Sequence, residues 1–146
     1  MKKIYVFGNP LIEEDSLPIK LIPSLQKVFP NIDFIVVDPN ENFPPEGEKN
    51  ITIIDTIQDI KKPSILDLED LKEITNTPIT PHDYDLSFHL FLLKKRKKID
   101  RVRIIGIPSW YDRIKMVDIV LELERIISNL PAKNARHRTY RDQRRG

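Results

Sequence analysis

The chain contains no cysteine among its 146 residues. A disulfide framework and a cysteine-based zinc site are therefore excluded, and any metal site has to be built from Asp, Glu and His. No hydrophobic run is long enough to span a membrane, and the N-terminus lacks the layout of a signal peptide. We therefore expect a cytoplasmic protein without a membrane anchor.

Glycine is scarce as well, with four in the chain. The segment FGNP near the N-terminus is followed by neither a glycine-rich run nor a Walker-type lysine, which argues against a phosphate-binding loop. No serine occupies an elbow of the Gly-x-Ser-x-Gly kind. With cysteine also absent, the sequence gives no support to nucleophilic catalysis by a serine or cysteine.

Charge is distributed unevenly, although the formal net charge is only +2. Residues 132–146 hold six Lys or Arg against one Asp, whereas residues 1–131 hold eighteen basic and twenty-one acidic residues. We interpret residues 1–131 as one domain and residues 132–146 as a basic, disordered tail. A basic arm can bind nucleic acid, but one short arm on an acidic body is weak support, so we do not expect that partner.

Hydrophobic patterning predicts strands that are separated by helices. The predicted strands are residues 3–8, 33–38, 51–56, 63–68 and 101–108. The predicted helices are residues 16–28, 68–74, 84–98 and 113–127. This alternation indicates an α/β fold, a three-layer α/β/α sandwich around a mostly parallel, twisted sheet of about five strands.

Two local features modify this prediction. Pro18 fits the first turn of the first helix, whereas Pro23 should kink that helix or split it. Only twelve residues separate the second and third predicted strands, which leaves little room for a helix between them.

Acidic residues gather at the expected carboxyl edge of this sheet, where open α/β folds bind ligands. Asp15 follows the first strand, Asp38 and Asp55 end the second and third, and His82 lies in a loop before a helix. Two carboxylates and an imidazole suit a divalent transition metal with open positions. Each acid could instead cap a turn or a helix, and His82 could be a hydrogen-bonding residue at a helix entry.

Four short motifs occur in the same order as in a known family. They are GNPLIEEDSLP at residues 8–18, IIDT at 53–56, TPHDYDL at 80–86 and RIIGIP at 103–108. Together they resemble the maturation endopeptidases of nickel–iron hydrogenases, over residues 3 to about 130. The first resembles the family pattern Gly-Asn-x-Leu-x-x-Asp-Asp-Gly-x-Gly, with Glu14 in place of the first Asp and Asp15 at the second.

The resemblance implies an endopeptidase that removes the C-terminal extension of a hydrogenase large-subunit precursor after nickel insertion. It implies that Asp15, Asp55 and His82 form the trio that contacts nickel, which arrives in the precursor. The metal would polarise the scissile carbonyl, activate water, or do both. The base that deprotonates water stays open, with Glu14 as a candidate.

The chain also departs from the family pattern. Family glycines are replaced by Glu13, Ser16 and Pro18, and an Asp-Gly-Gly segment after the second strand reads Asp-Pro-Asn at residues 38–40. The helix that usually follows is missing from the prediction. These departures leave a second hypothesis open, a non-catalytic binding or assembly module that uses the same sheet edge.

Overall fold

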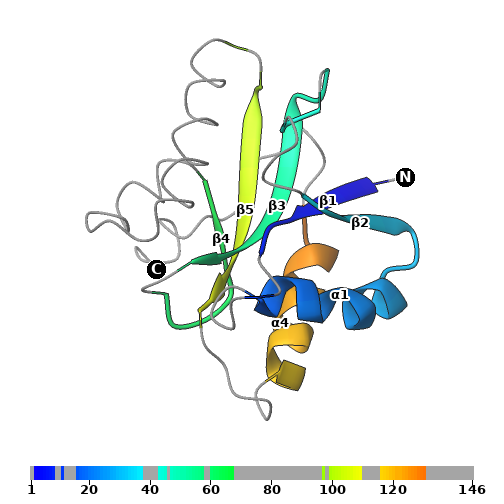
Figure 1. Cartoon of the computed structure of the whole chain (residues 1–146), viewed down its shortest axis with the longest axis vertical. Helices are drawn as coiled ribbons and strands as arrows, with labels where there is room; N and C mark the ends of the chain where they lie inside the picture. The colour runs from blue at the N-terminus through cyan, green and yellow to red at the C-terminus, as the bar shows by residue number, and fades with distance from the viewer. Residues whose placement is uncertain are drawn as a thin grey trace.

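The computed structural model describes residues 2–8, 11, 16–37, 43–45, 47–57, 60–67, 97, 99–109 and 116–130. Within these ranges the chain forms a five-stranded sheet in the order β2-β1-β3-β5-β4 (Figure 1). The strands are β1 (Lys2–Val6), β2 (Ile32–Val36), β3 (Asn50–Ile57), β4 (Ser64–Leu66) and β5 (Arg101–Pro108). All neighbours pair in parallel except β4, which is antiparallel to β5. The predicted α/β fold with a mostly parallel sheet of five strands is confirmed.

The strands form where isoleucine and valine are concentrated, because β-branched side chains fit a pleated, buried surface. β3 is the central strand, and seven of its eight residues are buried. A strand that is covered on both faces does not alternate between apolar and polar residues, which explains the continuous run ITIIDTI.

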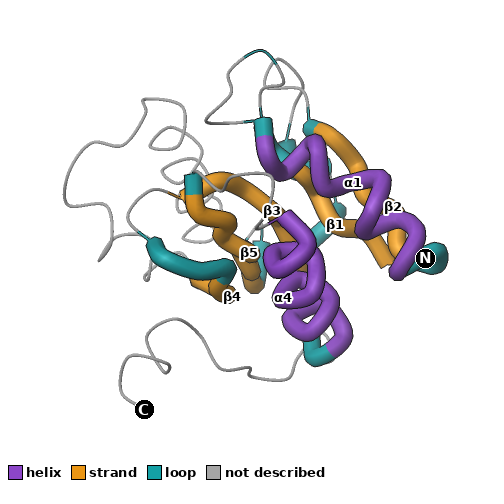
Figure 2. Tube along the Cα trace, turned by 90° about the horizontal axis from the view of Figure 1, so that it is seen from below, coloured by secondary structure: helices purple, strands orange, loops and turns teal. Residues whose placement is uncertain are grey.

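One face of the sheet is covered by α1 (Leu17–Val28) and α4 (Met116–Ser128), which contact each other (Figure 2). In α4 the buried side chains recur at helical spacing, so one stripe faces the sheet; they are Ile119, Leu123, Ile126 and Ile127. The helices predicted at 68–74 and 84–98 lie outside the described residues. The third layer of the sandwich therefore stays a prediction.

α1 runs through Pro23 without interruption, so of the two predicted effects of this proline, a kink or a split, the split is wrong. Pro23 is exposed, whereas Leu21 and Leu25 are fully buried against the sheet. A proline inside a helix leaves the carbonyl four residues earlier without its N–H donor, and water can hydrate that carbonyl on the exposed side of the helix. Packing of Leu21 and Leu25 on the sheet keeps the helix continuous. Pro18 lies in the first turn, as predicted.

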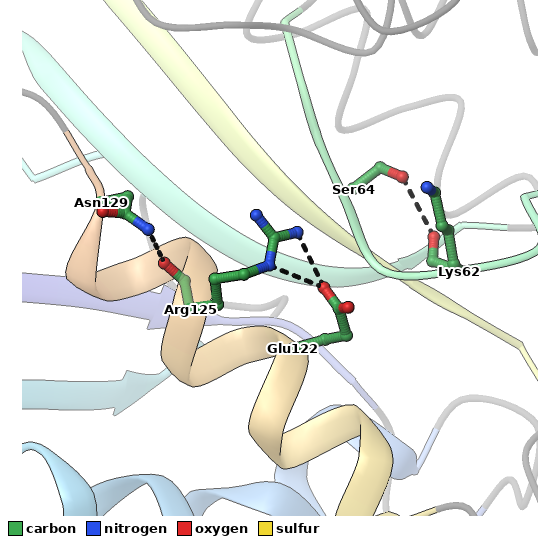
Figure 3. A network of polar contacts seen from close by, with 5 residues as sticks. All are labelled: Lys62, Ser64, Glu122, Arg125 and Asn129. Carbon is green, nitrogen blue, oxygen red and sulfur yellow. Dashed lines mark hydrogen bonds and ion pairs between the residues drawn. The ribbon is translucent and has the colours of Figure 1, made fainter.

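α4 ends in a short network of polar contacts, which Figure 3 shows. Asn129 Nδ2 donates to the carbonyl of Arg125 at 2.8 Å, so one of the last carbonyls of the helix is satisfied. Arg125 pairs with Glu122 at 2.8 Å one turn earlier, and both side chains are largely exposed. Elsewhere in the figure, Ser64 Oγ donates to the carbonyl of Lys62 at 3.1 Å, just before β4.

The opposite face of the sheet carries a second apolar cluster, which includes Tyr5 and Phe7. Described residues of the connection from β2 to β3 lie against it, namely Val37 and Phe43. After Val37, the described residues of this connection are 43–45 and 47–49; they contain no helix, as the length of the connection led us to expect, and we call them the Phe43 strap. The ring of Phe43 packs edge-on against Tyr5 and Phe7, with centroid distances of 5.1 Å to each.

The other end of the Phe43 strap is held by polar contacts. The Tyr5 hydroxyl donates to Glu48 Oε2 at 2.5 Å, and Lys3 Nζ lies 3.4 Å from Glu48 Oε1. Alternate residues of a strand point to the same face, so Lys3, Tyr5 and Phe7 form one row along β1. The Phe43 strap therefore follows this row from Phe7 back towards the start of β1.

Candidate functional site

The order of the strands defines a switch point between β1 and β3. The chain leaves β1 through α1 to reach β2 on one side, and it leaves β3 to reach β4 and β5 on the other. Connections that diverge in this way leave a crevice at the carboxyl ends of the two strands, which is where open α/β folds bind ligands. Asp55 lies in β3 at this point.

The backbone around Asp55 shows where β1 leaves the sheet. Val6 is level with Ile54, and the Phe7 N–H donates to the Ile54 carbonyl at 2.9 Å. The next N–H on this edge of β3 belongs to Thr56, and a continued parallel ladder would direct it to the carbonyl of Phe7. It donates instead to Asp55 Oδ1, at 2.8 Å. The carboxylate of Asp55 thus replaces the departing strand as acceptor and is held on the β1 side of β3.

Asp55 is only 4% exposed, although it carries an ionisable carboxyl group. Alternation along β3 places its side chain on the face that carries Ile53 and Ile57, opposite α1 and α4. A carboxylate on an apolar face is stable only when hydrogen bonds or a cation compensate for lost hydration. The Thr56 N–H supplies one such bond and fixes the orientation of the group.

The strand around Asp55 differs from the prediction in one respect. β3 does not end at Asp55 but continues to Ile57. The reason is that β5 remains beside β3 after β1 has left, with Ile57 paired to Pro108. Asp55 is therefore a residue within a strand that has lost one of its two neighbours.

On the β5 side, Asp55 is paired with Gly106. A Cβ atom at Gly106 would lie 2.7 Å from Cδ1 of Leu66 and 2.8 Å from Cγ1 of Ile57, which no side chain can tolerate without a shift. These residues are buried. Gly106 is thus required for close packing beside the candidate site, a role that the sequence motif alone did not reveal.

The other predicted site residues, Asp15 and His82, and the further candidate Asp38 lie outside the described residues. Within the described part of the chain, no three residues of the types Asp, Glu and His are grouped closely enough to hold a metal. Asp15 lies between two described residues in the sequence: Phe7, which bonds to Ile54 next to Asp55, and Ser16, which is buried. Convergence of Asp15, Asp55 and His82 on nickel stays a prediction.

Sequence reasoning did not identify Thr56 or the Phe43 strap as neighbours of the site. The contribution of Thr56 comes from its backbone N–H, which every residue but proline has, so no side-chain pattern marks it. Its hydroxyl oxygen is buried without a hydrogen-bond partner in the described structure. Phe43 is an apolar residue in a turn-rich segment, and its contact with Phe7 could not be predicted because it depends on the tertiary fold.

The comparisons with known proteins agree with an α/β fold of this class. The structure is similar to that of the hydrogenase maturating endopeptidase HybD from E. coli, with a TM-score of 0.59 and 14% sequence identity. The match covers 88% of this chain and 93% of that protein. No protein-family model and no curated sequence matches the chain. None of the described helices is long and apolar enough to cross a membrane.

Proposed function

We propose that this protein is an endopeptidase that removes the C-terminal extension of a nickel–iron hydrogenase large-subunit precursor after nickel insertion, in the cytoplasm. The observation that carries the proposal is the buried carboxylate of Asp55 at the switch point, oriented by the Thr56 N–H. The likeness to HybD, a hydrogenase maturating endopeptidase, supports it at the level of the fold. The motifs that contain Asp15, Asp55 and His82 support it at the level of the residues.

In this proposal nickel is part of the substrate, and Asp15, Asp55 and His82 contact it when the precursor docks. Carboxylate and imidazole ligands are suitable for nickel. Asp55 fits the role, because a buried carboxylate on an apolar face gains more from an incoming cation than an exposed one. Its orientation by the Thr56 N–H limits the reorganisation that binding requires. A metal held by these residues would polarise the scissile carbonyl, activate water, or do both.

The proposal is tested with purified large-subunit precursor in nickel-loaded and nickel-free forms. The full-length protein should shorten the C-terminus of the nickel-loaded form and leave the nickel-free form intact, as measured by mass spectrometry. Cleavage of neither form would sink the proposal. Binding of the loaded precursor without cleavage would instead establish the non-catalytic assembly module.

Replacement of Asp55 tests its role in the same assay. Asp55→Asn keeps the size of the side chain and an oxygen that can accept from the Thr56 N–H, but it removes the charge. We expect the rate of cleavage to fall by at least about 10- to 100-fold, the loss typical of residues that only support a metal ligand. The matched control is Asp33→Asn, which removes an exposed carboxylate from the edge strand β2 and should cleave at the native rate.

A further inference from the structure

The Phe43 strap contacts β1 at the point where that strand leaves the sheet. In the described part of this segment, Phe7 is the last residue with an assigned hydrogen bond to β3, and it is 3% exposed. The Phe43 ring meets it edge-on, at an interplanar angle of 86°. The same ring meets Tyr5 at 72°, and Glu48 accepts from the Tyr5 hydroxyl. The Phe43 strap is therefore attached to β1 and Phe7 at both ends, through the aromatic contacts of Phe43 and through the polar contacts of Glu48 with Tyr5 and Lys3.

The position of Phe7 determines whether its carbonyl can accept a hydrogen bond from the Thr56 N–H. Two acceptors compete for this N–H, the carbonyl of Phe7 in a continued ladder and the carboxylate of Asp55. The structure has the second arrangement, with Thr56 bonded to Asp55 Oδ1 at 2.8 Å. A change that lets Phe7 move along or towards β3 would favour the first arrangement and remove the Thr56 hydrogen bond from Asp55.

We propose that Phe43 is a positioning residue for the candidate site. By packing on Phe7, it fixes the point at which β1 leaves β3 and so keeps the Thr56 N–H on the Asp55 carboxylate. The Phe43 strap, which contains no helix, thus positions the candidate site from the connection between β2 and β3. The inference relies on the proposed function only for the choice of Asp55 as the working carboxylate.

The test uses the amide proton of Thr56 as a reporter in the full-length, ¹⁵N-labelled protein. An N–H bonded to a carboxylate differs from one bonded to a carbonyl in chemical shift, and Asp55→Asn gives the reference for loss of that charge. In Phe43→Ala we expect the Thr56 resonance to move towards this reference, because its N–H then donates part of the time to the neutral carbonyl of Phe7. Phe43→Leu keeps an apolar contact with Phe7 and should show a smaller change in the same direction.

The control variant is Ile22→Ala. Ile22 is half-buried on α1 and packs on the opposite face of the sheet, so its truncation lowers stability without touching the Phe43 strap. The proposal predicts an unchanged Thr56 resonance in this variant. Equal changes in Ile22→Ala and Phe43→Ala would overturn it, because general loosening would then explain both. A native Thr56 resonance in Phe43→Ala would overturn it as well.

If Phe43→Ala does not fold, Phe43→Leu carries the test alone, and a native Thr56 resonance in that variant overturns the proposal. The reporter requires no substrate and no catalysis. Failure of the native protein to cut any precursor would therefore refute the proposed function and leave this inference standing. Native cleavage by a variant with a displaced Thr56 resonance would show instead that the hydrogen bond exists but is not needed for the reaction.

Discussion

At the scale of single residues, the candidate site depends on groups that are small or belong to the backbone. Asp55 supplies the charge, but the Thr56 N–H orients it and Gly106 leaves the room beside it. Of these three positions, Gly106 is the one where the structure has no room for an added side-chain atom.

Gly106 gives the first stability prediction. Gly106→Ala forces a Cβ against Leu66 and Ile57, both buried and unable to retreat into solvent, so we expect a loss of about 1–3 kcal/mol in the free energy of unfolding. Urea denaturation measures it. Gly47→Ala is the informative contrast, since Gly47 has a positive φ of 90° but no atom within 4 Å of the added Cβ. The loss of stability in Gly47→Ala arises from backbone strain alone, roughly 1–2 kcal/mol.

A double variant tests whether the loss of stability in Gly106→Ala is caused by contact with Leu66. Leu66→Ala removes the atom nearest to the added Cβ. The combination with Gly106→Ala should then cost less than the sum of the two single changes, because the residues share one contact. Strict additivity would show that the cost of Gly106→Ala does not arise from Leu66.

At the scale of elements, α1 contains an interior proline, Pro23, that lowers the stability of the helix. Pro23→Ala restores a backbone N–H to the helix interior, which raises the free energy of unfolding by up to about 3 kcal/mol. The unfolded chain also becomes more flexible without the proline, which lowers the free energy of unfolding by about 0.4–1 kcal/mol. We expect net stabilisation of about 1–2 kcal/mol, measured by chemical denaturation. Pro18→Ala, in the first turn where no intrahelical donor is lost, should give no such gain. Equal effects of the two changes would contradict this account.

The polar contact of the Phe43 strap should make stability depend on alkaline pH. Burial first, and then the hydrogen bond to Glu48 and its negative charge, raise the pKa of Tyr5 well above its ordinary value. A pKa raised by folding contributes stability that is complete below the unfolded-state value, about 10, and is lost as pH rises above it.

Tyr5→Phe removes both the hydrogen bond and this titration. It should be less stable than the native chain by about 1 kcal/mol at pH 8, since it leaves Glu48 without the hydroxyl donor. The difference should narrow as pH rises from about 10 to 11. Urea denaturation of both proteins at several pH values measures it. Curves that stay parallel across this range would show that Tyr5 titrates with its ordinary pKa.

At the scale of the whole molecule, much of the sheet was predictable because isoleucine-rich runs coincide with buried strands. The segment RVRIIGIP forms β5 over the predicted residues, and PSILDL contains the short strand β4. The continuation of β3 past Asp55 was not predictable, since it depends on β5 remaining when β1 departs. Likewise, the continuity of α1 through Pro23 depends on which side of the helix faces the sheet.

The central pairing of the sheet also has a consequence for how the protein reaches its native state. β3 and β5 form eight residue pairs, and the first of them joins Asn50 to Arg101, which lie about a third of the chain apart. Contacts between such distant segments form slowly, because a long loop must close before any of them is gained. The unit made of β1, α1 and β2 is local and can form earlier. Asp55 therefore reaches its final environment only after β5 has docked, so a nascent chain that has not yet extended past residue 108 lacks the assembled site.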